Sequence, residues 1–257
     1  MAVRGRLRVL LGAAPGVGKT YAMLDEGKHL RAGGSDVVIA VVETHGRAAT
    51  AAMTEGMEVI PRHYVECRGI ELPEMDLDGV LAQHPDVALV DELAHTNAPG
   101  SRNEKRWQDV EELLEAGIDV ISTVNIQHIE SLNDVVEQIT GVPQRETVPD
   151  TVLRRASQVE VVDLAPQALR DRLSSGKVYP AERIDAALSN YFRLGNLTAL
   201  RELALLWVAD EVDHALADYR SEHGIDSRWE ARERVVVALT GGREGETLLR
   251  RGARIAV

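Results

Sequence analysis

The chain has 257 residues, a formal net charge of −12 and a hydrophobic share of 44%. This length allows one large α/β domain, alone or with an appendage, and the hydrophobic share is enough for an extended core. The negative charge argues against nucleic acid or an anionic membrane as a partner of the surface as a whole.

Cys67 is the only cysteine, which excludes an intrachain disulfide and argues against a cysteine-based metal site. His45, His95 and His128 would all lie at the carboxyl edge of the expected sheet, but the metal-binding spacing H-E-x-x-H is absent. No apolar run approaches the roughly 18 to 20 residues that span a bilayer, and the N-terminal apolar stretch is too short for a signal peptide. We therefore expect a cytoplasmic chain with no direct membrane insertion and no dedicated transition-metal site.

The first expected strand, 6–12, runs into a loop rich in Gly and Pro, and a helix over 19–32 follows that loop. The segment that joins them reads GAAPGVGKT, which is close to the phosphate-binding (Walker A) pattern G-x-x-x-x-G-K-[ST]. Backbone N–H groups can surround a phosphate only where the chain turns tightly, and glycines allow that turn. The amides then converge at a helix N-terminus, where the helix dipole also favours an anion.

Lys19 and Thr20 supply the side chains of this expected site. Lys19 would reach the β- and γ-phosphates of ATP, and the Thr20 hydroxyl would ligate Mg²⁺. The pattern departs at Ala13, which stands where the first glycine is expected. The alternative is an ordinary Gly-rich turn that happens to precede a lysine. The expected nucleotide-binding residues of the loop are Pro15, Gly16, Val17, Gly18, Lys19 and Thr20.

The second expected strand, 36–43, is a continuous β-branched run, as in parallel strands that are buried on both faces. The polar group Thr44-His45-Gly46-Arg47 follows it, at the edge where open α/β sheets bind ligands. After a helix over 47–55, residues 57–75 are expected to be irregular, because Pro61 and Pro73 break the pattern. A short edge strand at 64–69 and a helix over 76–83 complete this part.

The strand 87–90 is apolar and ends in Asp91-Glu92, which is the Walker B pattern of phosphate-loop nucleotidases. Asp91 would join Thr20 at Mg²⁺, directly or through the metal's hydration shell. Glu92 would hold the attacking water as a catalytic base. The alternative is an ordinary strand followed by an acidic turn. The Walker B pattern is weak alone, and it becomes specific because the phosphate loop lies some 70 residues earlier.

The next segments continue the alternation of helix and strand, which predicts a parallel, doubly wound sheet. Strand-end residues Thr123 and Asn125 can sense a γ-phosphate or bond the local backbone instead. Arg102 and Arg106 are candidates for an arginine finger in cis or across a dimer, although arginines at such places are usually solvated. The expected elements are a helix at 104–116, a strand at 118–128, a helix at 130–140 and a strand at 157–163.

From residue 165 the pattern becomes helical. Helices are expected from 165, over 179–189, and over 196–221 with Asn196 as N-cap. The apolar stripe of the last helix, from Leu200 onward, would pack on the sheet or alternatively form a dimer or interdomain contact. We therefore expect a nucleotide-binding α/β domain (1–164), a helical extension (165–222), and a linker with the truncated start of a second α/β domain (223–257).

Several segments together resemble one family: GAAPGVGKTYAML, VVETHGR, ALVDELAHTN and GNLTALRELAL. They are similar to the N-terminal cytoplasmic region of Kdp-type osmosensitive potassium sensor histidine kinases, and the resemblance covers about residues 5–221. The truncated start of a second α/β domain, within 223–257, resembles the start of that family's universal-stress-protein-like domain. The resemblance implies a P-loop NTPase-like, ATP-binding regulatory domain that precedes four transmembrane helices and a kinase core. It also implies control of the kinase/phosphatase balance that sets potassium-transporter expression.

Three hypotheses follow for this chain. It is a sensing module that binds ATP·Mg²⁺ with little turnover, an ATPase or small-molecule phosphotransferase with Glu92 as base, or a protein with an inactive loop. The motifs of a histidine kinase core are absent from the sequence, so we expect no phosphorylation on histidine by this chain. The expected partners are the kinase core, the stress-protein-like domain and a second copy in a homodimer. The chain is expected to be either a fragment or a naturally short member of the family.

Overall fold

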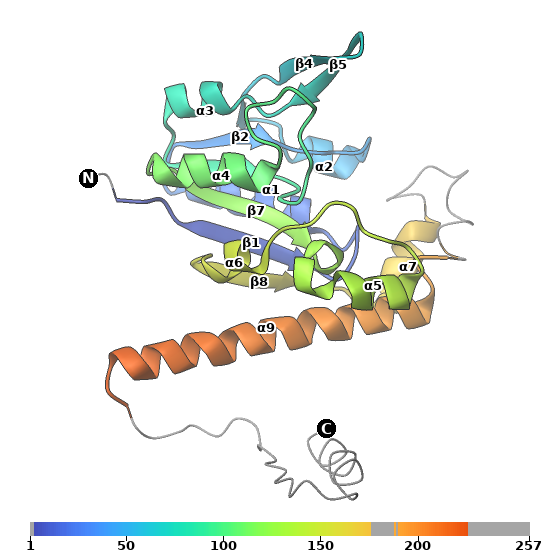
Figure 1. Cartoon of the computed structure of the whole chain (residues 1–257). Helices are drawn as coiled ribbons and strands as arrows, with labels where there is room; N and C mark the ends of the chain where they lie inside the picture. The colour runs from blue at the N-terminus through green and yellow to red at the C-terminus, as the bar shows by residue number, and fades with distance from the viewer. Residues whose placement is uncertain (1–2, 176–187, 189, 226–257) are drawn as a thin grey trace, which may run out of the picture. The chain divides into compact units, whose positions relative to one another are not determined.

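The computed structural model describes residues 3–175, 188 and 190–225. The chain divides into two units, Met1–Glu211 and Val212–Val257. In the described part of the first unit, six parallel strands form one sheet in the order β3-β2-β6-β7-β1-β8 (Figure 1). The strands are β1 (Leu7–Gly12), β2 (Val37–Val41), β3 (Glu58–Val59), β6 (Val87–Val90), β7 (Asp119–Asn125) and β8 (Gln158–Val162). The parallel α/β sheet expected from the sequence is therefore confirmed.

The central strands form because their residues are β-branched or aliphatic and become buried on both faces. Every residue of β2 and of β6 is buried, as expected of a parallel sheet with helices on each side. Successive residues of β1 enter two different core clusters, because side chains alternate between the faces of a strand. Val9 and Leu11 belong to one cluster, and Leu10 belongs to the other. The sheet is thus covered on both faces.

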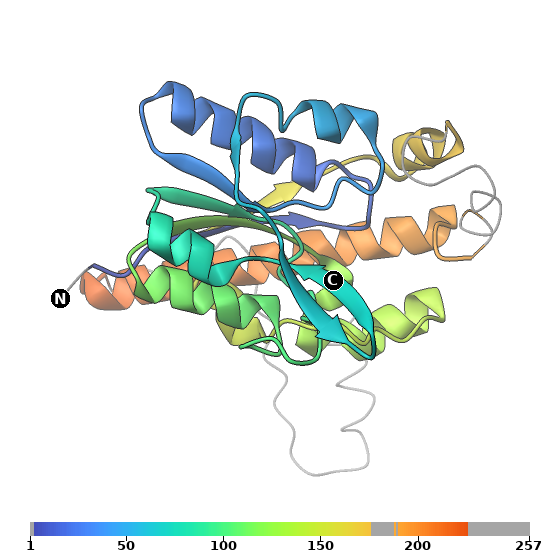
Figure 2. The same ribbon diagram turned by 90° about the horizontal axis from the view of Figure 1, so that it is seen from above.

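Helices supply the two covering layers. Figure 2 shows α1 (dark blue) on one side of the sheet and α3 and α4 on the other. Met23 and Leu24 of α1 pack with Leu10 and Leu89, whereas Val80 of α3 belongs to the opposite cluster. The helices are α1 (Lys19–Ala32), α2 (Ala48–Ala52), α3 (Leu77–Gln83), α4 (Arg106–Glu115), α5 (Asn133–Thr140), α6 (Asp150–Arg154), α7 (Pro166–Ser174) and α9 (Leu194–Glu222).

Residues 57–75 differ from the prediction of an irregular segment with a single edge strand. β3 joins the main sheet, and β4 (His63–Cys67) and β5 (Ile70–Glu74) form a separate antiparallel hairpin. Arg68 and Gly69 turn the hairpin with positive φ of 53° and 80°, as a tight hairpin turn requires. Pro73 is accommodated because each strand of a two-stranded hairpin has a free edge, where a missing N–H does not interrupt the pairing.

Several element boundaries also differ. α2 is shorter than the expected helix over 47–55, and the strand expected at 118–128 ends at Asn125, after which two 3₁₀ turns (Ile126–His128 and Glu130–Leu132) lead into α5. The short helix α6 was not predicted. α9 begins at Leu194, so the prediction of Asn196 as N-cap was wrong. Instead, Asn196 Nδ2 donates to the Asn190 carbonyl at 3.2 Å.

The first part of α9 packs on the sheet. Leu200, Ala204 and Trp207 are buried in the same cluster as the strand residues, which confirms the predicted packing for this stretch. Farther along, Val212 is 51% exposed. No described helix is long and apolar enough to cross a bilayer. The helix expected over 179–189, apart from residue 188, and the closing β-α piece from 226 onward lie outside the described residues, and the proposed domain boundaries stay predictions.

Candidate functional site

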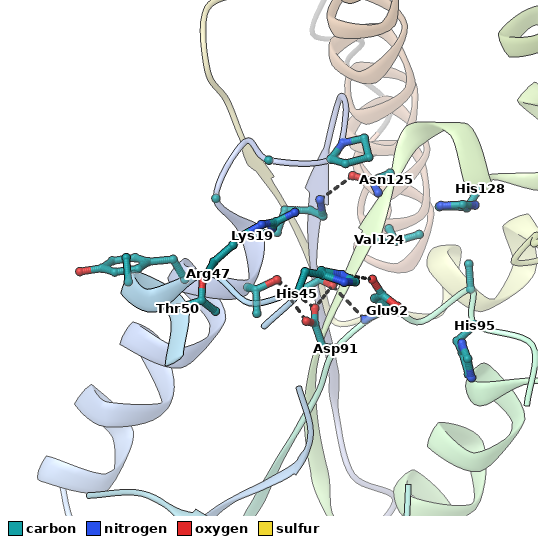
Figure 3. A pocket seen from close by; sticks show the side chains of 18 of the residues that line it. Lys19, His45, Arg47, Thr50, Asp91, Glu92, His95, Val124, Asn125 and His128 are labelled. Carbon is teal, nitrogen blue, oxygen red and sulfur yellow. Dashed lines mark hydrogen bonds and ion pairs between the residues drawn. The ribbon is translucent and has the colours of Figure 1, made fainter. Parts of the chain in front are cut away.

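A pocket of about 340 Å³ lies at the carboxyl ends of β1, β6 and β7 (Figure 3). It gathers most of the residues selected from the sequence, because parallel strands bring their carboxyl ends to one edge of the sheet. These lining residues are Pro15, Gly16, Gly18, Lys19, Thr20, Asp91, Glu92, Thr123 and Asn125. Of the expected loop residues, Val17 alone does not line the pocket, and it is buried in a cluster with residues of α7 and of the region where α9 begins.

The loop between β1 and α1 takes the tight conformation that its glycines allow. Gly16 and Gly18 have φ of 91° and 116°, in the region that L side chains rarely adopt. Gly12 is required for a different reason, because a Cβ there would lie 2.7 Å from Val17 Cγ2. Ala13 does not have a positive φ. No glycine is therefore needed at the one position where the sequence departs from the pattern.

Lys19 is the first residue of α1, and its ammonium group reaches the end of β7. Its Nζ donates to Asn125 Oδ1 at 2.5 Å, and the residue is only 8% exposed. Burial lowers the pKa of Lys19 to about 8, although the carboxylates of Asp91 and Glu92 oppose this shift. The site thus holds a cation with few surrounding waters, which is well suited to an anionic ligand.

Asp91 and Thr20, 71 residues apart in sequence, meet in the pocket. Thr20 Oγ1 lies 3.1 Å from Asp91 Oδ2, and Asp91 also accepts hydrogen bonds from Thr123 Oγ1 at 2.5 Å and from the Glu43 amide at 3.2 Å. Burial raises the pKa of Asp91, while these hydrogen bonds favour its ionised form. A carboxylate and a hydroxyl at this distance offer the oxygen ligands that Mg²⁺ prefers.

Glu92 forms a hydrogen bond with His45, with His45 Nε2 at 3.0 Å from Glu92 Oε1 (Figure 3). Both residues have positive φ, 56° for Glu92 and 49° for His45, and such strained non-glycine backbone is concentrated at functional sites. Although burial opposes it, the His45 hydrogen bond lowers the pKa of Glu92. The same hydrogen bond raises the pKa of His45. The candidate base is therefore held in place by a hydrogen bond from the turn after β2.

Neither candidate arginine finger lies in this pocket. Arg106 is 1% exposed, and its Nη1 donates to the Asp91 carbonyl at 3.0 Å while Nη2 lies 3.5 Å from Glu74 Oε2. Arg102 forms ion pairs with Asp78 and Glu112 on the surface. The structure therefore gives no support to an arginine finger in cis. Arg102 is a surface ion-pair residue, as the alternative expected, whereas Arg106 is buried and supports the end of β6.

The candidate histidines have other partners than a metal. His95 Nε2 lies 3.1 Å from Glu74 Oε2, and His128 Nδ1 lies 2.8 Å from the Glu146 carbonyl. Burial lowers the pKa of His128, so its ring is neutral at pH 7. In the described part of the chain, no group of three or more His, Cys, Asp or Glu side chains is arranged to hold a metal ion.

Sequence reasoning missed several lining residues, because they belong to no motif. They come from the start of α1, the turn before α2, the segment after α5, and α7: Tyr21, Arg47, Glu146 and Arg172. Arg47 had been noted only as part of a polar group after β2. Arg172 carried no signal in the sequence, since only the fold brings α7 beside the loop.

The fold and the site together define the class: an α/β protein with a parallel sheet, and a glycine-rich loop beside a buried aspartate at the sheet's carboxyl edge. The family model described as "Osmosensitive K+ channel His kinase sensor domain" matches residues 3–212. The chain belongs to this family, as the resemblance of its motifs predicted.

Curated relatives agree with this family. The chain is 67% identical over 253 residues to "Sensor protein KdpD" of Mycobacterium tuberculosis strain H37Rv, covering 98% of this chain and 29% of the relative. It is 70% identical over 241 residues to the protein of the same name in Rathayibacter rathayi, covering 93% and 28%. It is 50% identical over 254 residues to "Putative sensor protein KdpD" of Synechocystis, covering 98% and 67%. The chain thus spans less than a third of the first two relatives.

Proposed function

We propose that this chain is an ATP-binding regulatory domain of a two-component potassium or osmotic sensor kinase, with a P-loop NTPase-like fold. The main support for this proposal is that Thr20 Oγ1 lies 3.1 Å from Asp91 Oδ2, beside the buried side chain of Lys19. These residues come from the two motifs that the sequence singled out. A chance Gly-rich turn would give no reason for the aspartate of another strand to lie at its end.

The residues of the pocket fit ATP and Mg²⁺ by their chemistry. The amides of the loop around Gly16 and Gly18, together with Lys19, offer N–H donors and a cation to the phosphates. Thr20 and Asp91 offer oxygen ligands to Mg²⁺, which when bound neutralises phosphate charge. Asn125 holds the Lys19 ammonium at 2.5 Å in the direction of the pocket.

The relatives' printed name supports a sensing role rather than an independent enzyme. Each is called a sensor protein, and this chain corresponds to a part of it. The remaining domains of such a kinase, including its kinase core and a stress-protein-like domain, are the proposed partners, and a homodimer is a further proposal. ATP occupancy would then shift the kinase/phosphatase balance by favouring one of two conformations of the chain.

An ATPase or phosphotransferase with Glu92 as base is the second candidate, because Glu92 is ionised and lies in the same pocket. Measuring phosphate release by the purified chain with saturating ATP and Mg²⁺ separates the two. The sensing proposal predicts binding with release well below about 1 s⁻¹, the low end of ordinary enzyme turnover. Release faster than this that disappears in Glu92→Gln would establish the enzyme instead.

The pKa of Lys19 gives a pH dependence with a definite sign. The protonated ammonium is the form that attracts phosphate, and with a pKa of about 8 it is lost as the pH rises through that value. Between pH 7 and pH 9 the protonated fraction falls about tenfold, so ATP affinity should weaken roughly tenfold. Calorimetric titration at the two pH values measures this change. Lys19→Ala should show no comparable loss between them, and an equal affinity of the wild type at pH 7 and pH 9 would contradict the assignment.

A further inference from the structure

Helix α7 contacts the phosphate loop from outside the sheet. Arg172 Nη1 donates to the carbonyl oxygens of Gly16 at 3.2 Å and Val17 at 3.5 Å. The same nitrogen lies 3.6 Å from the position that a Cβ on Gly18 would occupy. The guanidinium therefore lies against the three loop residues that precede Lys19, and it also lines the pocket.

Apolar packing joins the same parts of the chain. Val17 is 5% exposed and Ala14 is fully buried, and both belong to one cluster with residues of α7 and of the region where α9 begins. Arg170 Nη1 adds a hydrogen bond to the Phe192 carbonyl at 2.9 Å. The buried members of the cluster are Ala14, Val17, Leu169, Leu173, Phe192 and Leu197.

The contacts between α7 and the phosphate loop affect the conformation of the loop. A loop that turns its N–H groups into one concavity directs carbonyl groups away from it, and those carbonyls need donors of their own. Arg172 is the donor for two of them. Because a ligand's apparent affinity scales with the fraction of protein in the binding conformation, a contact that favours the turned loop also favours anion binding.

We propose that Arg172 is a positioning residue that holds the phosphate loop in its anion-binding conformation and couples nucleotide occupancy to the docking of α7. This inference rests on the proposed function and deepens it, since it names the route from the pocket to the helical extension. Coupling is reciprocal: if docked α7 strengthens ATP binding, bound ATP must stabilise docked α7 by the same factor.

The first test compares the affinities of ATP, ADP and pyrophosphate for the wild type and for Arg172→Ala. The loss of a charged donor should weaken all three by a similar factor, roughly fivefold to tenfold, because Arg172 acts on the loop rather than on one phosphate. Arg172→Lys, which keeps a cationic donor, should recover part of the affinity. Arg155→Ala, which removes an exposed arginine outside the pocket, should bind as the wild type.

The second readout is amide hydrogen exchange of residues 166–174. ATP should slow exchange there in the wild type and have little effect in Arg172→Ala, whereas a merely structural role would not make protection depend on ATP. If Arg172→Ala unfolds, the comparison is made with Arg172→Lys. An affinity of Arg172→Ala within twofold of the wild type, a loss confined to ATP, or unchanged exchange in α7 would overturn the inference.

Lys19→Ala separates this inference from the proposed function. If the wild type does not bind ATP, or Lys19→Ala binds it equally well, the proposed function itself fails. If Lys19→Ala loses binding while Arg172→Ala does not, only the role of Arg172 and α7 is overturned.

Discussion

Replacing Lys19 with alanine should weaken ATP binding about 100-fold, equivalent to about 2.7 kcal/mol, as measured by calorimetric titration with Mg²⁺ present. The reason is the position of the ammonium group, which is only 8% exposed and held by Asn125 at the end of β7. A cation removed from water interacts more strongly with phosphate than a surface lysine does. The fold should survive, because burial already penalises the charged form of this side chain.

Lys28→Ala is the matched control for this prediction. Lys28 lies on the same helix and does not line the pocket, so its replacement should leave ATP affinity within about twofold of the wild type. If Lys19→Ala and Lys28→Ala bind ATP equally well, the loop is an inactive one and the pocket serves another purpose.

Replacing Arg106 with alanine should lower the free energy of unfolding by about 3 kcal/mol, because a buried guanidinium and its hydrogen bond are lost. The buried Glu74 carboxylate would then keep only its contacts with His95 and the Ala98 amide. Arg106 is 1% exposed, donates to the Asp91 carbonyl at 3.0 Å, and lies 3.5 Å from the Glu74 carboxylate. Urea denaturation of the two proteins measures the difference.

Arg102→Ala is the control within the same stretch of sequence. Its guanidinium is exposed and forms surface pairs with Asp78 and Glu112, so its loss should leave the denaturation midpoint almost unchanged. Equal denaturation midpoints for the two variants would show that the buried pair contributes little to stability. They would also contradict the proposal that Arg106 stabilises the end of β6.

Much of the sheet could be predicted because unbroken aliphatic runs in the sequence indicate buried strands. The runs that became β2 and β6 are unbroken and aliphatic, and such runs occur where helices cover both faces of a sheet. The short edge strand expected at 64–69 corresponds largely to β4, but its partner β5 was missed. This hairpin is largely exposed, so its residues show no apolar run, and Pro73 disguised the second strand. The helix α6, five residues long, was too short for a periodic pattern to form.

The candidate site, like the sheet, could be predicted only in part. Lys19, Thr20 and Asp91 were predicted from motifs, because phosphate and Mg²⁺ place strict demands on residue type and spacing. The His45–Glu92 pair and the loop contact of Arg172 were not, since each depends on segments that only the fold brings together. The burial of Arg106 was not expected either, because sequence alone does not distinguish a buried arginine from a solvated one.

The most direct test of the account is a calorimetric titration of the wild-type chain with ATP, with and without Mg²⁺, together with Asp91→Asn. We predict saturable binding at one site that Mg²⁺ strengthens, and loss of the Mg²⁺ effect in Asp91→Asn, because the Asp91 carboxylate and the Thr20 hydroxyl at 3.1 Å are the proposed metal ligands. The absence of ATP binding by the wild type, or an undiminished Mg²⁺ effect in Asp91→Asn, would contradict the assignment of this pocket to ATP·Mg²⁺.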